Sequence, residues 1–596
     1  MIAKLGEHWR PLGVLYRAAT RARRRDLLGL LPLTTIAAFA ELVSLGALVP
    51  FITILATPQR AAPLWRLAGL ERALGPVDPN GIVWIGAGVF AALLAFSAVF
   101  RFLVIAATAK FAVRLGTDLS TALLTKVLAQ SYAYHSQINS AEILTAFEKV
   151  RLICQGVIVS LLLAASSLIM ALFIAVGLLI VDWRLALGSV FLVGLTYVLV
   201  SVIVKGMQSR NGVIVSQLYP RRSQVAQEAL GGIRDVILDH SQDVFIARFS
   251  ALDARIADAQ ASNLIISSSP RTFIESFGML LIVGATLMLS ARSGGLASAL
   301  PALGALALGA QRLLPLFQQI YAGWSQFRGN HALLVDVVAF LSLPDAPVQA
   351  ATPRLGFERE IALERVRFRY RHDQPLVIDD ISMTIQKGER VAIIGATGSG
   401  KSTLMDIVLG LLTPSDGVVR IDGARLDAEH VRAWQRVVAH VPQNIFLSDG
   451  SFAQNIAFGL PEGEIDMAKV RDAARRAGLA DVIADQPLGY DQIIGERGVR
   501  LSGGQRQRIG IARALYKDAA VLVFDEATSA LDMDTERRVM SSIESLDENL
   551  TVILIAHRLS TVRHCDRVYR LDRGKLIDVV KGSEVEAAAA VARSND

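Results

Sequence analysis

The uneven distribution of apolar residues constrains this chain more than any other feature. Six long stretches, all before residue 311, carry very few charges; they are 27–55, 82–108, 154–181, 185–204, 273–291 and 293–310. An α-helix needs about 20 apolar residues to cross the hydrocarbon core of a bilayer. One such stretch could be a buried core helix, but six in succession predict six membrane-spanning helices.

Composition and charge placement agree with a membrane protein. Hydrophobic residues make up 52% of the chain and charged residues 19%, against about 25% charged in soluble domains. Mean hydropathy is +0.43. The two cysteines, Cys154 and Cys565, lie too far apart in sequence to indicate a disulfide framework or a cysteine zinc site.

The net charge of +7 does not indicate a nucleic-acid partner, and we expect none. The basic residues that stand out cluster just before the first apolar stretch, at Arg17, Arg21, Arg23, Arg24 and Arg25. Basic residues beside a membrane helix favour the cytoplasmic side. We therefore expect a multi-pass protein of the bacterial inner (plasma) membrane, with its N-terminus and everything after the sixth span in the cytoplasm.

The segments between the apolar stretches differ in length and character. Segments 109–153 and 205–269 are long and polar, and we expect helices that continue beyond the bilayer there. Segment 63–75 reads as an external amphipathic helix at the membrane interface, or as a plain helix in a loop. Composition changes after Arg328, so we expect a membrane domain over 1–335, a linker over 336–356 and a second domain over 357–596.

The second domain alternates strand-like and helix-like segments, which predicts an α/β fold with parallel strands. The apolar run 390–394 leads into Gly395-Ala-Thr-Gly-Ser-Gly-Lys-Ser402, which matches the phosphate-binding P-loop G-x-x-x-x-G-K-[ST] between a strand and a helix. In such a loop backbone N–H groups surround phosphates. We expect Lys401 to reach the β- and γ-phosphates of ATP and the Ser402 hydroxyl to bind Mg²⁺.

Two acids follow another apolar run, 521–524. We expect Asp525 to belong to the metal shell and Glu526 to polarise the attacking water. The sequence Leu501-Ser502-Gly503-Gly504-Gln505 precedes Asp525 by 20 residues. With this set of motifs the chain resembles the ABC transporters, over essentially its whole length, as an exporter-type half-transporter: a six-span α-helical membrane domain followed by an α/β P-loop ATPase domain.

The resemblance implies roles for further residues. Glu526 and His557 would be catalytic, and Asp532 would belong to the D-loop. Metal binding would involve Ser402, Gln443 and Asp525. The expected ATP-binding residues are Tyr370, which would stack on adenine, with Gly395, Ala396, Thr397, Gly398, Ser399, Gly400, Lys401, Ser402, Thr403 and Gln443.

The family architecture also implies a dimer. The signature residues 501–505 would act on ATP bound by the partner's P-loop, so a second subunit is required. Intact motifs favour a homodimer, with a heterodimer as the alternative. Segments 132–140 and 227–235 occupy the places of the family's two coupling helices.

A second resemblance indicates what kind of molecule is transported, here called the cargo. Segments 41–51, 270–275 and 312–315 are similar to the flippases of lipid-linked oligosaccharides. Arg101, Arg271 and Arg312 lie in or beside apolar spans, where a charge costs roughly 2.5–3.5 kcal/mol and usually faces a cavity. Guanidinium groups bind phosphate oxygens with two hydrogen bonds, so these arginines could hold a lipid pyrophosphate. Alternatively, Arg271 pairs with Glu275, and Arg101 lies where its span leaves the bilayer.

We therefore expect an ATP-driven flippase for a lipid-linked, pyrophosphate-bearing saccharide. The alternatives are an exporter of lipid A-like lipids or amphipathic drugs and, from another class, an ATP-gated regulator or channel.

Overall fold

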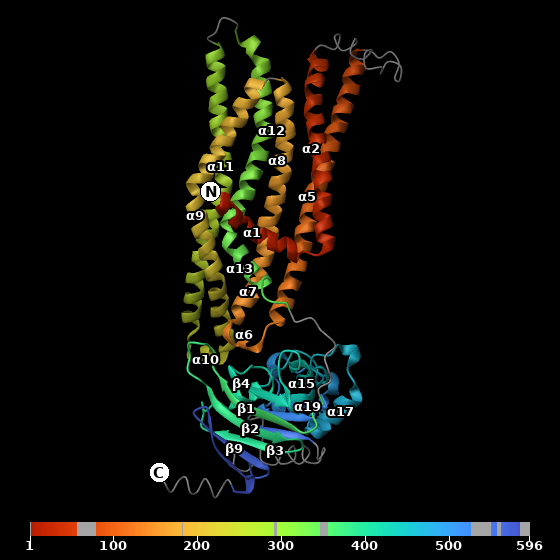
Figure 1. Cartoon of the computed structure of the whole chain (residues 1–596). Coiled ribbons are helices and arrows are strands. Elements are labelled where there is room, and N and C mark those ends of the chain that lie inside the picture. The colour runs from red at the N-terminus through yellow and green to blue at the C-terminus, as the bar shows by residue number, and fades with distance from the viewer. Residues whose placement is uncertain are drawn as a thin grey trace. The chain divides into compact units, whose positions relative to one another are not determined.

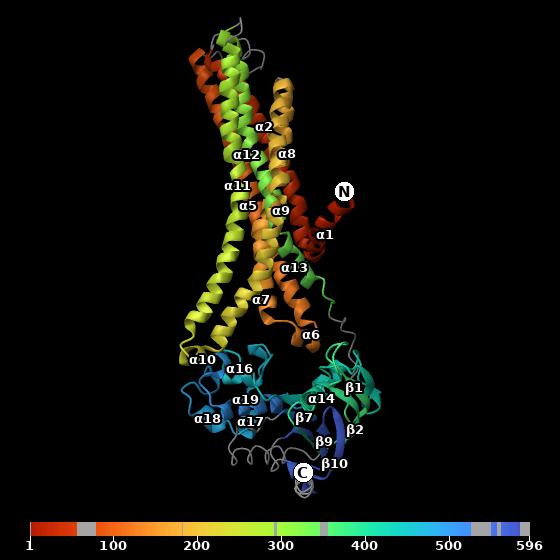
Figure 2. The ribbon, with the colours of Figure 1, turned by 90° about the vertical axis from the view of Figure 1, so that its left-hand side faces the viewer.

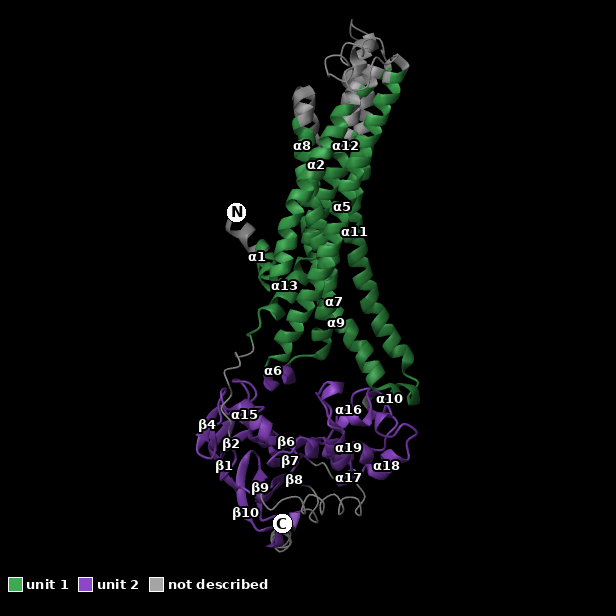
Figure 3. Cartoon of the chain, turned by 90° about the vertical axis from the view of Figure 1, so that its right-hand side faces the viewer, with its two compact units in different colours: residues 1–130, 138–346 green, residues 131–137, 347–596 purple. Residues whose placement is uncertain are grey.

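The computed structural model describes residues 2–56, 79–181, 183–290, 295–345, 356–525, 550–556 and 562–584. The chain divides into two compact units, shown in green and purple in Figure 3. The first comprises residues 1–130 and 138–346, and the second 131–137 and 347–596. The segment 63–75, where the sequence predicts an external helix, lies outside the described residues.

The described part of the first unit is helical (Figure 1). Its elements are α1 (Ile2–Ala18), α2 (Arg21–Ala56), α5 (Pro79–Leu128), α7 (Ser140–Leu152), a π-helical segment (Ile153–Ile158), α8 (Val159–Val181), α9 (Trp183–Gly231), α10 (Ile233–Leu238), α11 (Gln242–Ser290), α12 (Gly295–Gly329) and α13 (His331–Leu341).

Among the described residues, four helical segments are long and apolar enough to cross a membrane: 21–47, 83–128, 140–176 and 194–231. They cover or overlap the first four predicted spans. The fifth and sixth predicted spans lie along α11 and α12. The unit is thus a helical transmembrane domain whose described helices are consistent with six crossings.

Helices continue beyond the apolar spans, as the sequence predicts. Helix α5 has 50 residues, and α9 and α11 have 49 each. At 1.5 Å per residue each is about 75 Å long, more than twice the bilayer core of about 30 Å. The short helix α10 follows α9 at the break at Gly232 and leads into α11 (Figure 2). It begins later than the expected segment 227–235, because residues 227–231 still belong to α9.

A partly buried ion pair stabilises the helices of this unit outside the apolar spans. Lys149 of α7 is 5% exposed and donates to the backbone oxygen of Ser216 in α9 at 3.2 Å. The same ammonium pairs with Asp336 of α13, which also accepts a hydrogen bond from the Ser216 hydroxyl at 2.5 Å. Three helices far apart in sequence are thereby joined.

The second unit contains two sheets. An antiparallel sheet has the order β2-β1-β4-β5, formed by β1 (Glu360–Phe368), β2 (Ile378–Gln386), β4 (Asp416–Ile421) and β5 (Ala424–Arg425). The larger sheet has the order β10-β9-β3-β8-β7-β6, formed by β3 (Arg390–Gly395), β6 (Val438–Val441), β7 (Val521–Asp525), β8 (Thr551–Ile555), β9 (Arg567–Asp572) and β10 (Lys575–Val580). Only β10 is antiparallel to its neighbour there.

Helices cover the larger sheet. The described helices of this unit are α6 (Tyr132–Gln137), α14 (Lys401–Val408), α15 (Val431–Val437), α16 (Phe452–Ile456), α17 (Met467–Arg476), α18 (Ala480–Ala484) and α19 (Gly503–Tyr516). Successive strand residues point to opposite faces. Thus Val523 packs in one core with Leu404 of α14, while Phe524 packs in another with Ile509 of α19. Helices α14 and α19 therefore lie on opposite faces of the sheet.

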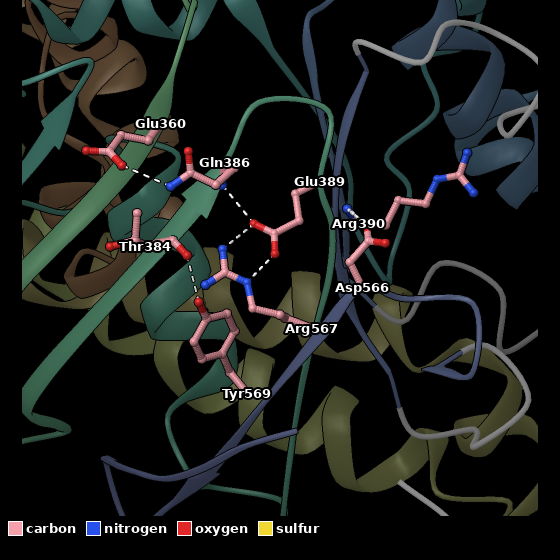
Figure 4. Close-up of polar contacts among 8 residues, drawn as sticks. All are labelled: Glu360, Thr384, Gln386, Glu389, Arg390, Asp566, Arg567 and Tyr569. Atoms are coloured by element: carbon pink, nitrogen blue, oxygen red, sulfur yellow. Dashed lines mark hydrogen bonds and ion pairs between the residues drawn. The ribbon is translucent and has the colours of Figure 1, made fainter. Parts of the chain in front are cut away.

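Polar contacts hold together the amino ends of β3 and β9 (Figure 4). Arg567 at the start of β9 pairs with Glu389 just before β3, and Glu389 also accepts from the backbone N–H of Gln386 at 2.8 Å. Tyr569 donates to the backbone oxygen of Thr384 in β2 at 2.6 Å. These contacts lie at the opposite end of the strands from the P-loop, which follows the carboxyl end of β3.

Candidate functional site

The P-loop joins β3 to α14 in a conformation that requires glycine. Gly398 and Gly400 have φ angles of 82° and 99°, in the left-handed region that disfavours other residues. A Cβ at Gly395 would come within 2.2 Å of the backbone oxygen of Leu571, and one at Gly400 within 3.0 Å of that of Val377. The loop is thus packed closely against its own domain, while Ala396, Thr397 and Gly398 are exposed at its crest.

Two polar side chains of the P-loop, those of Ser399 and Lys401, are buried. Lys401, the first residue of α14, is 6% exposed and donates to the backbone oxygens of Gly395 and Ala396 at 2.9 and 3.0 Å. The hydroxyl of Ser399 is buried without a hydrogen-bond partner among the described residues. Both the ammonium and the free hydroxyl suit anionic phosphate oxygens. Ser402 is exposed at the start of α14, where backbone N–H groups favour anions.

The aromatic residue expected to stack on adenine lies beside this helix. Tyr370 is 37% exposed, and its hydroxyl lies 3.1 Å from that of Thr403 in α14. The backbone oxygen of Tyr370 accepts from Gln137 of α6 at 3.4 Å. Helix α6, which falls within the expected coupling segment 132–140, therefore contacts the backbone at this aromatic residue.

Acidic residues gather near the carboxyl end of β7. Asp525 is the last residue of that strand, and its charge, after the larger effect of burial, raises the pKa of Asp406 in α14 to about 6. The charge of Asp406 in turn is the main cause of the raised pKa of Tyr132 in α6. Asp406 is not among the site residues predicted from the sequence. Its signal was an acid inside the otherwise apolar run Leu404–Val408.

The neighbouring strand β6 leads to Gln443, which is exposed two residues after the strand ends. β6 and β7 are parallel neighbours, so Gln443 and Asp525 both follow carboxyl ends at the same sheet edge. Within β6, burial lowers the pKa of His440 to about 4.

The segment 501–505 forms the start of α19. Ser502 is the N-cap: its hydroxyl accepts from the backbone N–H of Gln505 at 3.2 Å, and the Gln505 side chain accepts from the Ser502 N–H at 2.8 Å. The N–H groups of Gly503 and Gly504 are then in the first turn, where a helix favours anions. Leu501 precedes the cap and packs against the core beneath α19.

Three predicted site residues, Glu526, Asp532 and His557, lie outside the described residues. Glu526 directly follows β7 in the sequence, and His557 follows Ala556 at the end of β8. The predicted membrane arginines have different surroundings. Arg101 is exposed on α5, Arg271 pairs with Glu275 of α11 at 2.8 Å, and Arg312 belongs to α12 but its side chain is not described.

Both units match known protein families. Residues 33–296 match the ABC transporter transmembrane region, and residues 378–529 match the ABC transporter domain. A solved structure of a bacterial Atm1-family ABC exporter with ATP bound superposes with a TM-score of 0.74 at 25% identity, over 93% of this chain and 98% of that one.

Curated relatives give the same result. An ATP-dependent lipid A-core flippase of Ralstonia nicotianae is 30% identical over 534 residues, which are 87% of this chain and 84% of the relative. Flippases of the same name from Alkalilimnicola ehrlichii and Cupriavidus metallidurans are 40% identical over 266 residues (45% of each chain) and 32% identical over 373 residues (61% of each chain).

The chain contains a bundle of membrane helices followed by a sheet domain with a P-loop. The matches to known proteins extend over both parts and cover nearly the whole chain. This protein therefore belongs to the ABC transporter family, as a multi-pass membrane protein that couples ATP hydrolysis to transport.

Proposed function

We propose that this protein is a homodimeric flippase of the bacterial inner membrane that moves a lipid-linked, pyrophosphate-bearing saccharide. The observation that supports a lipid cargo most directly is the similarity of the chain, over 87% of its length, to a protein named an ATP-dependent lipid A-core flippase. A polar headgroup is supported by Arg101, Arg271 and Arg312, which lie on helices of the membrane domain. Charges in such helices usually line a cavity.

A second candidate cargo is a lipid A-like lipid. The printed names of the relatives favour it, and it shares the chemistry that matters here, because it too would present phosphate and sugar to the arginines. The N-terminus and the ATPase domain would be cytoplasmic in either case, where ATP is available.

The ATP site supports the energy-coupling step. Lys401 and the unpartnered hydroxyl of Ser399 lie where phosphates would be bound, and Tyr370 would stack on adenine. Ser402, Gln443 and Asp525 supply the oxygen ligands that Mg²⁺ prefers, so these residues fit the ion, which would neutralise charge on the β- and γ-phosphates. Glu526 would position the attacking water, and His557 would contact the γ-phosphate.

The two faces of the sheet support a site shared between subunits. Lys401 begins α14 on one face, and Ser502 caps α19 on the other, so the P-loop and the signature lead into helices on opposite faces of the sheet. A second subunit would supply the signature that completes each ATP site.

The function is tested with purified protein in proteoliposomes. We expect ATP-dependent flipping and stimulated ATPase activity with a fluorescent polyprenyl-pyrophosphate saccharide, and none with a cationic dye. Replacement of Arg101, Arg271 and Arg312 together by alanine should abolish lipid flipping. Flipping of lipid A alone would favour the second candidate, and transport of the dye alone would contradict both.

A further inference from the structure

Helix α11 contains a proline whose missing hydrogen bond is replaced by another helix. Pro270 has no N–H, so the backbone oxygen of Ile266 loses its usual partner four residues on. The hydroxyl of Tyr321 in α12 donates to this oxygen at 3.1 Å. The side-chain amide of Gln318, also in α12, donates to the next backbone oxygen, that of Ser267, at 2.8 Å.

A third helix completes this support. The hydroxyl of Tyr197 in α9 donates to the side-chain oxygen of Gln318 at 2.9 Å. Tyr197 and Tyr321 are each 5% exposed, with ring centres 5.3 Å apart. Their polar groups are used within the protein, so this group of side chains fixes α11 around Pro270.

The turn that follows Pro270 presents an open ion pair. Nε of Arg271 donates to Glu275 at 2.8 Å, yet the two side chains are 52% and 46% exposed. The pair lies at the cytoplasmic start of the fifth predicted span, about one turn after the backbone oxygens held by Tyr321 and Gln318. Charged groups in membrane helices usually face a polar cavity and not lipid, so this exposed pair is available to polar groups of the cargo.

The chemistry of the Arg271–Glu275 pair indicates which part of the cargo it would bind. Glu275 neutralises Arg271 and would repel a pyrophosphate, so the pair is unlike an isolated phosphate-binding arginine. Among the described residues, the guanidinium keeps four further N–H donors, and the second oxygen of Glu275 remains an acceptor. A sugar ring carries neighbouring hydroxyls, each both donor and acceptor, and these match such a mixed group.

We propose that Arg271 and Glu275 bind saccharide hydroxyls of the cargo, while Tyr321 and Gln318 position the pair through the backbone of α11. This inference rests on the proposed function and refines it: the pyrophosphate is left to other groups, and the sugar is recognised here.

The test compares two lipids in proteoliposomes that contain the full-length protein: a polyprenyl pyrophosphate that carries a disaccharide, and the same lipid without sugar. In Glu275→Gln, the concentration of the saccharide lipid that half-saturates the stimulated ATPase should rise about tenfold or more, as for loss of a hydrogen bond to a charged group. For the lipid without sugar it should stay the same or fall, because a repulsive charge is removed. Ser276→Ala is the matched control, since that hydroxyl, among the described residues, donates only to the backbone of its own helix, at Thr272.

A separate measurement tests whether Tyr321 positions the Arg271–Glu275 pair. Tyr321→Phe should raise the half-saturating concentration for the saccharide lipid more than for the lipid without sugar, whereas a general loss of packing would affect both equally.

Other results would overturn the inference. If Glu275→Gln lowers the half-saturating concentration of both lipids or changes neither, the pair does not bind sugar, although the flippase function stands. If Glu275→Gln dissociates the dimer in light scattering, the pair is a subunit contact. If neither lipid stimulates the wild-type protein, the proposed function fails, and this inference with it.

Discussion

Lys401 illustrates how single residues prepare this protein for nucleotide. Its ammonium is buried and hydrogen-bonded to two backbone oxygens of the P-loop, Gly395 and Ala396. Binding of ATP would exchange these neutral acceptors for phosphate oxygens, and hydrogen bonds between charged groups are the stronger kind. Binding and chemistry should therefore depend on different residues.

That separation predicts different defects for two variants. Lys401→Ala should weaken ATP binding, because the phosphates lose their cation. Glu526→Gln should retain binding but lower turnover by about two orders of magnitude or more, because the attacking water loses its carboxylate. Binding of a fluorescent ATP analogue and phosphate release measure the two steps. Turnover of Glu526→Gln at the wild-type rate would contradict the role of this acid.

His440 predicts a pH dependence of stability. Burial lowers its pKa to about 4, against about 6.5 in an unfolded chain. Between these values the unfolded state binds a proton that the folded state does not, so stability falls as pH decreases from about 6.5 towards 4. At pH 5 the protonation of His440 in the unfolded state lowers the free energy of unfolding by about 2 kcal/mol.

His440→Gln should remove that contribution. Thermal unfolding of the full-length protein in detergent, at pH 7.5 and pH 5, should show a smaller loss of stability for the variant than for the wild type. His372→Gln, at an exposed position, is the control. Equal losses in wild type and His440→Gln would contradict the buried neutral histidine.

At the scale of whole helices, glycine sets how closely two elements approach. Gly212 of α9 lies against the end of α12, where a Cβ would come within 2.3 Å of the backbone oxygen of Gly329. Gly206, in the same helix, has no atom within 4 Å of such a Cβ among the described residues. Small residues allow this kind of close backbone contact between helices.

The two glycines should therefore respond oppositely to alanine. Gly212→Ala should destabilise the protein by roughly 1–3 kcal/mol, because α9 must move away from α12. Gly206→Ala should be neutral or stabilising by up to about 1 kcal/mol, because alanine favours a helix. Thermal midpoints of both variants in detergent give the comparison, and equal destabilisation would mean that the contact with Gly329 has no energetic importance.

For the molecule as a whole, α14 and α19 lie on opposite faces of the larger sheet, so Lys401 and Ser502 stand at the starts of helices that pack in different cores. The chain has one membrane domain and one ATPase domain, an architecture that implies dimerisation. In the proposed homodimer, each ATP would contact Lys401 of one subunit and Ser502 of the other.

Mixed dimers test this arrangement. Subunits with Ser502→Arg and subunits with Lys401→Ala should each form inactive dimers, since every site is damaged. Dimers purified through two different tags should regain partial ATPase activity, because one site then combines an intact P-loop with an intact signature. Inactive mixed dimers, with both subunits present, would contradict the cross-subunit site.

The sequence by itself determined the features that depend on residues close together in the chain. Apolar stretches longer than a bilayer is thick predicted membrane helices, and the glycine pattern at 395–402 predicted a phosphate loop between β3 and α14. The pairing of Arg271 with Glu275 was open to sequence reasoning, because residues four apart meet on one helical face. The start of α10 was misplaced, since the sequence does not show that α9 continues to the glycine pair 231–232.

The tertiary structure alone decided the contacts between distant segments. Lys149 meets Asp336, Tyr321 meets the backbone oxygen freed by Pro270, and Gly212 meets Gly329 across separations of more than 50 residues. Half-buried Asp406 acquires its raised pKa from partial burial and from Asp525, on a different element. The physical reason is that local periodicity selects helices and loops, whereas burial and pairing depend on which faces the folded chain brings together.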